Sequence, residues 1–213
     1  MTKKRPARVA VFASGNGSNF EAIMENWQKT GFDQGQVVLV ICNKKEAGVL
    51  KRAEKWQVPA YTFLPAEYAD KNQYEQAILN TLEAYEIDFI VLAGYMRLLG
   101  PVLLKPYAGR IVNLHPSLLP AFPGKDAIGQ ALEHGVRVSG ITIHFVDEGM
   151  DTGPIIYQEA VVLEPDETRE SLTAKIHAIE HRVYPEIIKA CLQGQAVLEG
   201  RRVKWLQPPL SVH

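Results

Sequence analysis

The stretch IVNLHPS, residues 111–117, places two polar side chains inside a run that otherwise has the pattern of a buried strand. Residues two apart in a strand share a face, so Asn113 and His115 point to one side and their apolar neighbours to the other. Pro116 lacks a backbone N–H and disfavours helix at the preceding residue, so we expect the strand to end at His115. One face of a strand end therefore presents an amide and an imidazole.

This strand end is a candidate catalytic site, because ligands of open α/β sheets bind at the carboxyl ends of strands. An Asn side chain can donate a hydrogen bond to a developing oxyanion, and a His can move a proton near neutral pH. Asn113 and His115 together suggest acyl-type transfer through a tetrahedral intermediate. The alternative is a capping Asn and a hydrogen-bonded core His, which an N-x-H triplet alone leaves open.

Composition places the chain among ordinary globular proteins. Its 213 residues are 46% hydrophobic and 22% charged, which fits one domain or two closely packed halves. The formal net charge of -1 provides no basic field, so binding to nucleic acid or to a membrane surface is not supported. A small-molecule partner is expected.

Cysteine usage and the amino terminus indicate a cytoplasmic protein. Cys42 and Cys191 are the only cysteines, and neither belongs to a C-x-x-C pair or another zinc spacing. The apolar run at residues 9–13 is too short for a signal peptide. No stretch reaches the length of a membrane span.

The run at residues 9–13 leads into the loop SGNGSN, residues 14–19, and then into a helical pattern. Strand, glycine loop and helix form a phosphate-binding arrangement, because glycines let the backbone approach an anion and the N–H groups of the helix point at it. Gly17, Ser18 and Asn19 are the candidate contacts. The alternative is a well-capped helix after a tight turn, with Ser18 or Asn19 as its N-cap.

This loop departs from the dinucleotide-binding pattern at two positions. Phe20 stands where a third glycine would fall. Cys42 and Asn43 follow the second strand, where an acidic residue would bind a ribose hydroxyl. The loop suits a single phosphate, and NAD is not expected.

Strand and helix patterns alternate through the first half of the chain. Apolar runs at 37–41, 60–63 and 88–93 predict strands, and helices are expected at about 47–57 and 68–85. This order predicts an α/β fold with a mostly parallel, twisted sheet, right-handed crossovers and helices on both faces, Rossmann-like in its amino-terminal half.

The segment GYMRLL, residues 94–99, leaves the carboxyl end of the strand at 88–93. Its backbone and its Met and Leu side chains could form an apolar slot for a flat heterocycle. A loop packed on a short helix at 101–107 is the alternative.

The second half continues with a proline-rich loop over the site, at 116–124. The further expectations are a helix capped by Asp126, strands at 139–146 and 155–162, a long helix at 168–193 kinked at Pro185, a hairpin at 196–206 and loosely held residues at 207–213.

The acidic loop DEGMDTGP, residues 147–154, supplies the carboxylate expected to pair with His115. That carboxylate is Asp151, because an Asp beside an imidazole fixes its tautomer and favours its protonated form. Asp147 and Glu148 are expected to be solvated loop charges.

A metal site made of His115, His144 and Asp151 is the alternative use of these side chains. The three residues contain no close i, i+4 pair, so we expect no metal.

Four motifs together carry a resemblance to a known family: SGNGSN at 14–19, LAGYMR at 92–97, NLHPSLLP at 113–120 and DEGMDTGP at 147–154. Their order and spacing resemble the folate-dependent formyltransferases, and among them the phosphoribosylglycinamide formyltransferases, over about residues 8–206. The resemblance implies one domain of the formyltransferase fold over residues 1–213, with a phosphate-binding half at about 8–100 and a catalytic, folate-binding half at 101–206.

The resemblance implies transfer of the formyl group of 10-formyltetrahydrofolate to the amine of phosphoribosylglycinamide in de novo purine biosynthesis. The H-P-S-L-L-P segment is shared with methionyl-tRNA formyltransferase and formyltetrahydrofolate hydrolase, so it specifies chemistry more than substrate. The glycine loop narrows the choice. The alternatives are a formyltetrahydrofolate hydrolase or a non-catalytic phosphate-binding module, and a homodimer stays open.

The roles that the resemblance implies fall into three groups. Asn113 and His115 would stabilise the tetrahedral oxyanion, and Asp151 would orient His115 and relay a proton. The ribonucleotide would contact Gly17, Ser18, Asn19 and Glu180. The folate would contact Lys71, Met96, Arg97, Leu98, Leu99, Asn113, Asp147, Glu148, Gly149, Met150 and Asp151.

Three positions differ from the family pattern or have an alternative role. Lys71 stands where related proteins have an Arg against the folate tail, and a Lys keeps the charge without the bidentate geometry. Residues 125–128 lack the histidines of some members, so no role is transferred to them. Glu180 has the alternative of a surface pair with Lys175 or Arg182.

Overall fold

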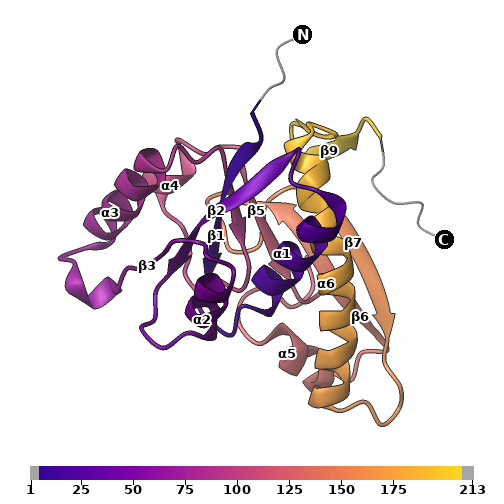
Figure 1. The fold of residues 1–213 in the computed structure, drawn as a ribbon. Coiled ribbons are helices and arrows are strands. Elements are labelled where there is room, and N and C mark those ends of the chain that lie inside the picture. The colour runs from indigo at the N-terminus through magenta and orange to yellow at the C-terminus, as the bar shows by residue number, and fades with distance from the viewer. Residues whose placement is uncertain (1–4, 208–213) are drawn as a thin grey trace.

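The structure, a computed structural model, describes residues 5–207, so the expectation for the chain end beyond Gln207 lies outside the described residues. Seven strands form one sheet in the order β3-β2-β1-β4-β5-β6-β7 (Figure 1). They are β1 (Ala7–Ala13), β2 (Gly35–Cys42), β3 (Ala60–Thr62), β4 (Phe89–Leu92), β5 (Ile111–His115), β6 (Val138–Phe145) and β7 (Ile155–Val162). The first five are parallel, whereas β6 is antiparallel to both β5 and β7. The predicted mostly parallel α/β sheet is confirmed.

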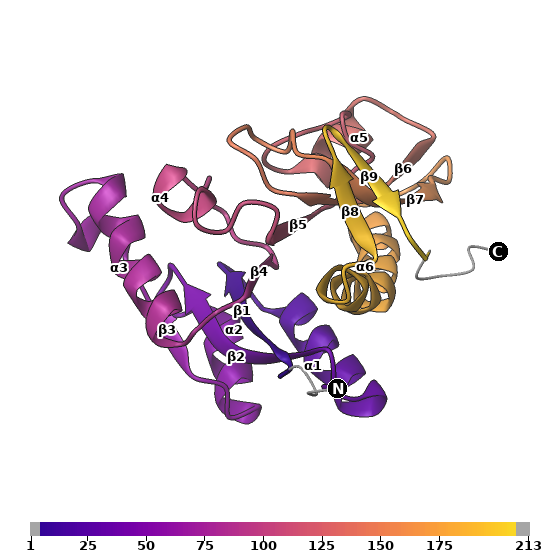
Figure 2. The ribbon, with the colours of Figure 1, turned by 90° about the horizontal axis from the view of Figure 1, so that it is seen from above.

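Helices cover both faces of this sheet. They are α1 (Ser18–Thr30), α2 (Gly48–Lys55), α3 (Lys71–Ala84), α4 (Pro101–Leu104), α5 (Ala127–Glu133) and α6 (Arg169–Leu192), with a 3-10 turn at Pro65–Glu67. A separate hairpin of β8 (Ala196–Glu199) and β9 (Arg202–Trp205) ends the described chain. Figure 2 shows α3 and α4 on one side of the sheet and α1 and α6 on the other. Within residues 5–207, no helix is long and apolar enough to cross a membrane.

The side chains of β1 alternate between the two faces of the sheet, and this explains why helices cover both faces. Val9 and Val11 belong to the core cluster under α1, α2 and α6, whereas Ala10 and Phe12 belong to the cluster under α3 and α4. Successive side chains of a strand point to opposite faces, so a strand that is apolar at every position is buried on both.

The start of α3 and the N-cap of α1 differ from the positions that the sequence suggests. The helix expected from residue 68 begins at Lys71, because the Asp70 carboxylate caps it by accepting the Gln73 N–H at 2.8 Å. The N-cap of α1 is Gly17, with φ 80° and no side-chain cap, rather than Ser18 or Asn19. A Cβ at Gly17 would lie 2.7 Å from the Val49 Cβ, so α2 approaches too closely for any other residue.

Other expected elements are present with small changes of boundary. Asp126 caps α5 by accepting the Gly129 N–H, as predicted. The long helix α6 continues through Pro185 and is one helix from Arg169 to Leu192. The predicted kink at Pro185 stays a prediction.

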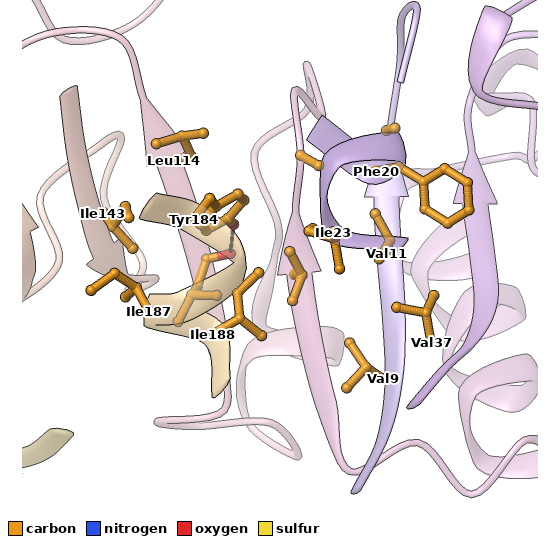
Figure 3. Close-up of a cluster of buried hydrophobic side chains, with 14 of the residues drawn as sticks. Val9, Val11, Phe20, Ile23, Val37, Leu114, Ile143, Tyr184, Ile187 and Ile188 are labelled. Carbon is orange, nitrogen blue, oxygen red and sulfur yellow. Dashed lines mark hydrogen bonds between the residues drawn. The ribbon is translucent and has the colours of Figure 1, made fainter. Parts of the chain in front are cut away.

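Tyr184 of α6 ties that helix to the centre of the sheet. Its side chain is fully buried, and its hydroxyl lies 2.8 Å from the Leu92 carbonyl of β4 and 3.3 Å from the Val112 carbonyl of β5. Figure 3 shows the ring among Leu114, Ile143, Ile187 and Ile188. This bond fixes α6 against the two strands whose ends form the candidate site.

We expect Tyr184→Phe to lower the free energy of unfolding by about 1–2 kcal/mol, because it leaves buried carbonyl acceptors without this donor. Urea unfolding monitored by circular dichroism would measure the change. Tyr61→Phe is the matched control, since the Tyr61 hydroxyl is exposed and bonds only to that of Tyr85 among the described residues. An equal effect of the two substitutions would contradict the role of Tyr184.

Candidate active site

The register of β5 and β6 brings two imidazoles and an amide to one face of the sheet. Asn113 of β5 lies opposite His144 of β6, and His115 lies opposite Thr142. Directly opposed residues of an antiparallel pair share a face. His115 and His144 are 5% and 2% exposed, so both rings lie inside the protein.

Asp151 completes this cluster from the loop between β6 and β7. Its Oδ2 lies 3.4 Å from His115 Nδ1, and its Oδ1 lies 3.7 Å from His144 Nε2. Asn113 Nδ2 lies 3.1 Å from His144 Nε2 and donates to Asp151 Oδ1 at 3.4 Å. Asp151 thus lies beside His115 and also beside a second histidine, while its catalytic role stays a prediction.

Backbone carbonyls determine one nitrogen of each imidazole that holds a proton. His115 Nε2 lies 2.8 Å from the Phe122 carbonyl, and His144 Nδ1 lies 2.8 Å from the Phe145 carbonyl. A carbonyl only accepts, so each of these nitrogens holds a proton. The remaining nitrogen of each ring therefore faces Asp151, and a proton added to His115 Nδ1 lies directly against the carboxylate.

The Asp151 carboxyl group has a pKa below its ordinary value. Burial alone would raise this pKa, but a hydrogen bond with His144, the Gly124 N–H at 2.7 Å and the charges of His115 and His144 lower it by more. Asp151 is therefore ionised at neutral pH. The cluster therefore combines an ionised carboxylate with two imidazole rings, and these are groups that can exchange protons near neutral pH.

The glycine loop leads directly into the amino-terminal end of α1. The first N–H groups of α1, from Ser18 onward, have no carbonyl partner within the helix. The loop backbone is held from behind by Arg52, whose Nε donates to the Asn16 carbonyl at 2.9 Å. Gly17 and Ser18 thus present backbone donors, whereas the Asn19 side chain turns toward α6.

Glu180 faces inward, contrary to the surface alternative. Its carboxyl group is 5% exposed, and Oε2 accepts a hydrogen bond from Asn19 Nδ2 at 3.0 Å. Burial raises the pKa of Glu180 to about 7, and the bond from Asn19 offsets only part of this. Lys175 and Arg182 bind Glu167 and Glu159 instead, as the structure shows for residues 5–207.

The segment after β4 exposes apolar side chains beside the glycine loop. Met96 and Leu98 are 63% and 51% exposed, whereas Leu99 is buried. The Met96 N–H donates to Ser14 Oγ at 2.8 Å, so the first residue of the glycine loop holds this segment. The Arg97 guanidinium lies over the Tyr74 ring, 5.2 Å from its centre. Met96 and Leu98 therefore expose apolar surface to solvent next to the glycine loop.

The acidic loop is closed by its own side chains. Asp147 Oδ1 accepts the Gly149 N–H at 3.1 Å and the Thr152 hydroxyl at 2.6 Å, so Asp147 is a half-buried turn former rather than the solvated charge predicted. Glu148 is exposed, as expected, and the Met150 side chain is 59% exposed.

Lys71, the predicted contact to the folate tail, is the first residue of α3. Its ammonium lies 3.7 Å from Glu75 Oε1, and its side chain is 45% exposed. The charge is thus available to an anion in solvent, and the contact stays a prediction.

His144 was predicted only as a ligand of the alternative metal site, whereas the structure places it beside Asn113 and Asp151. The signal for it was present, since the alternation of β6 puts Thr142 and His144 on one face next to β5. Within residues 5–207, no group of three His, Cys, Asp or Glu side chains is arranged to hold a metal ion.

Comparison with known proteins identifies the family of this chain. Residues 7–188 match the family described as Formyl transferase. Phosphoribosylglycinamide formyltransferase of Bacillus subtilis is 51% identical over 87% of this chain and 94% of its own. The crystal structure of glycinamide ribonucleotide transformylase 1 from Symbiobacterium toebii superposes with a TM-score of 0.92, at 44% identity and 95% coverage of both chains. A formyltetrahydrofolate deformylase from Pseudomonas syringae has a TM-score of 0.87 at 26% identity, over 96% of this chain and 67% of its own. The chain belongs to the formyl transferase family.

Proposed function

We propose that this enzyme transfers the formyl group of 10-formyltetrahydrofolate to the amine of phosphoribosylglycinamide, a step of de novo purine biosynthesis. The observation that carries the proposal is the cluster of Asn113, His115 and Asp151 on one face of β5. The Bacillus subtilis relative supports the choice of acceptor, because it has that name at 51% identity.

In the proposed reaction the amine nitrogen attacks the formyl carbon and gives a tetrahedral intermediate. Asn113 Nδ2 donates to the oxyanion, exchanging its long 3.4 Å bond to Asp151 for a stronger one. Once His115 Nδ1 has accepted a proton from the attacking amine, the ring adds positive charge near the oxyanion. The bond from carbon to N10 of the folate then breaks, and the proton lost by the amine reaches N10 through His115 Nδ1 and Asp151.

The substrates are proposed to bind on either side of this cluster. The phosphate takes the N–H groups of Gly17, Ser18 and Asn19, and Glu180 accepts from the ribose hydroxyls or the ammonium group. The folate is proposed to contact Lys71, Met96, Arg97, Leu98, Leu99 and the backbone of Asp147, Glu148, Gly149, Met150 and Asp151. No metal or nicotinamide takes part in this scheme.

The direct test is incubation with 10-formyltetrahydrofolate and phosphoribosylglycinamide, separately and together. We expect formyl-donor consumption only when both are present, without added metal. Consumption of the donor alone would identify a hydrolase, and no consumption under any condition would identify a binding module. Loss of activity with a chelator and its recovery with zinc would contradict the metal-free scheme.

Replacing Asp151 by Asn keeps the size of the side chain but removes the negative charge beside His115 on which the proposed proton relay depends. We expect kcat to fall at least about a hundredfold, about 2.7 kcal/mol in activation free energy, with little change in either KM. His115→Ala should be comparably severe. Asp166→Asn, at an exposed carboxylate outside the proposed site, is the control, and near-normal turnover of Asp151→Asn would refute the His115 partnership.

Glu180→Gln should raise the KM for phosphoribosylglycinamide about tenfold, about 1.4 kcal/mol, because a neutral amide accepts from the substrate less strongly. The KM for the folate should stay almost unchanged. Equal effects on both constants would remove Glu180 from the acceptor site.

The pH dependence of unfolding checks the same side chain without substrate. The pKa of Glu180 is raised from 4.5 to about 7 in the folded protein, so the folded state holds a proton that the unfolded state has lost between these values. The stability that this proton provides is present below pH about 4.5 and is lost as the pH rises through about 7. Glu180→Gln should therefore gain about 2–3 kcal/mol relative to the parent between pH 4.5 and 7.5. Glu186→Gln is the control, because Glu186 is another carboxylate of α6 that accepts a hydrogen bond from an Asn side chain, that of Asn26 in α1.

A further inference from the structure

The loop Ala121–Asp126 touches the two central residues of the active site from outside. The Phe122 carbonyl accepts from His115 Nε2 at 2.8 Å, and the Gly124 N–H donates to Asp151 Oδ2 at 2.7 Å. Both contacts come from the backbone. The position of the loop therefore determines whether His115 Nδ1 and Asp151 Oδ2 face each other.

This loop has a backbone that needs support. Phe122, Gly124 and Asp126 all have left-handed conformations, with φ of 53°, 82° and 56°. Such conformations cost about 1–2 kcal/mol for a residue with a Cβ, and they persist only where surrounding contacts enforce them. Two of the three residues have a Cβ, so the loop is expected to relax when its contacts are removed.

The strongest side-chain contact on this loop comes from Arg169, the first residue of α6. Its Nη1 and Nη2 donate to Asp126 Oδ1 and Oδ2 at 2.6 and 2.9 Å, a bidentate pair. Space for the pair is provided by Gly129, where a Cβ would lie 2.3 Å from both Arg169 Nη2 and Asp126 Oδ2. The pair is exposed to solvent, but the missing side chain at Gly129 leaves room for its bidentate geometry.

Two weaker contacts hold other parts of the loop. Gln130 Nε2 donates to the Lys125 carbonyl at 2.8 Å, and the Ser117 hydroxyl donates to the Ala121 carbonyl at 2.6 Å. These contacts keep the loop near the site when the ion pair is broken. We therefore expect the loop to shift, but to stay folded against the site, when the ion pair is broken.

We propose that Arg169 is a positioning residue for formyl transfer. Through Asp126 it holds the loop so that the Phe122 carbonyl and the Gly124 amide keep His115 and Asp151 aligned for proton relay. The same helix contains Glu180 and Tyr184, so α6 connects the proposed acceptor site, the sheet and the catalytic loop. The inference rests on the proposed transfer reaction for its kinetic readout, and the spectroscopic readout below is independent of that reaction.

The kinetic test uses Arg169→Gln, Asp126→Asn and the double variant. Asn still caps α5 and tolerates a left-handed conformation, so Asp126→Asn removes the ion pair alone. We expect each single variant to lower kcat about fivefold at low ionic strength, with both KM values unchanged and the double variant no slower than either. Arg169→Lys should recover part of the loss, because it keeps the charge without the bidentate geometry.

The control is Arg182→Gln, which removes an exposed ion pair from the same helix without touching the loop. In the parent protein the His115 Nε2–H should give a slowly exchanging imidazole signal by NMR, and Arg169→Gln should broaden it while Arg182→Gln does not. An unchanged signal and unchanged kcat would overturn the proposal. A rise in kcat would also overturn it, because the contact of His115 with the Phe122 carbonyl would then stabilise an inactive arrangement of the site. Losses in kcat that add in the double variant would overturn it as well.

Discussion

The antiparallel register of β5 and β6, with Asn113 opposite His144, is the constraint on which the site depends. A slip of one residue would turn His144 to the other face and leave Asn113 against an apolar side chain. The register is stabilised by the core on that other face, where Val112 and Ile143 lie fully buried under α6. Hydrophobic burial on one face therefore determines the polar geometry on the other.

Asp151 adds a negative charge to this arrangement of side chains. Its carboxylate receives a backbone N–H from Gly124 and lies against rings from two neighbouring strands, which together outweigh the cost of burial. The residue itself has a left-handed conformation, with φ 56°, so the acidic loop turns back over the face of β5 at this point. The charge is thus fixed by contacts from three separate segments.

The sequence was most informative where the signal was a side chain in a periodic pattern. Asn113, His115 and the inward Glu180 were predicted from strand alternation and the resemblance to a family, and their placement agrees with it. The cap at Gly17 was missed because the close approach of α2 is a tertiary effect. The contacts from Phe122 and Gly124 could not be predicted, because they use backbone atoms of a left-handed loop, and such atoms leave no pattern of residue types.

The central claim is that the face of β5 holds the reacting atoms between two substrate sites. A crystal structure with a non-reactive 10-formyltetrahydrofolate analogue and phosphoribosylglycinamide tests it most directly. The account predicts the analogue's N10 substituent within hydrogen-bond distance of Asn113 Nδ2, the acceptor amine on the Asp151 side and the phosphate on the N–H groups of Gly17 and Ser18. A complex in which both ligands bind away from Asn113, His115 and Asp151 would contradict it.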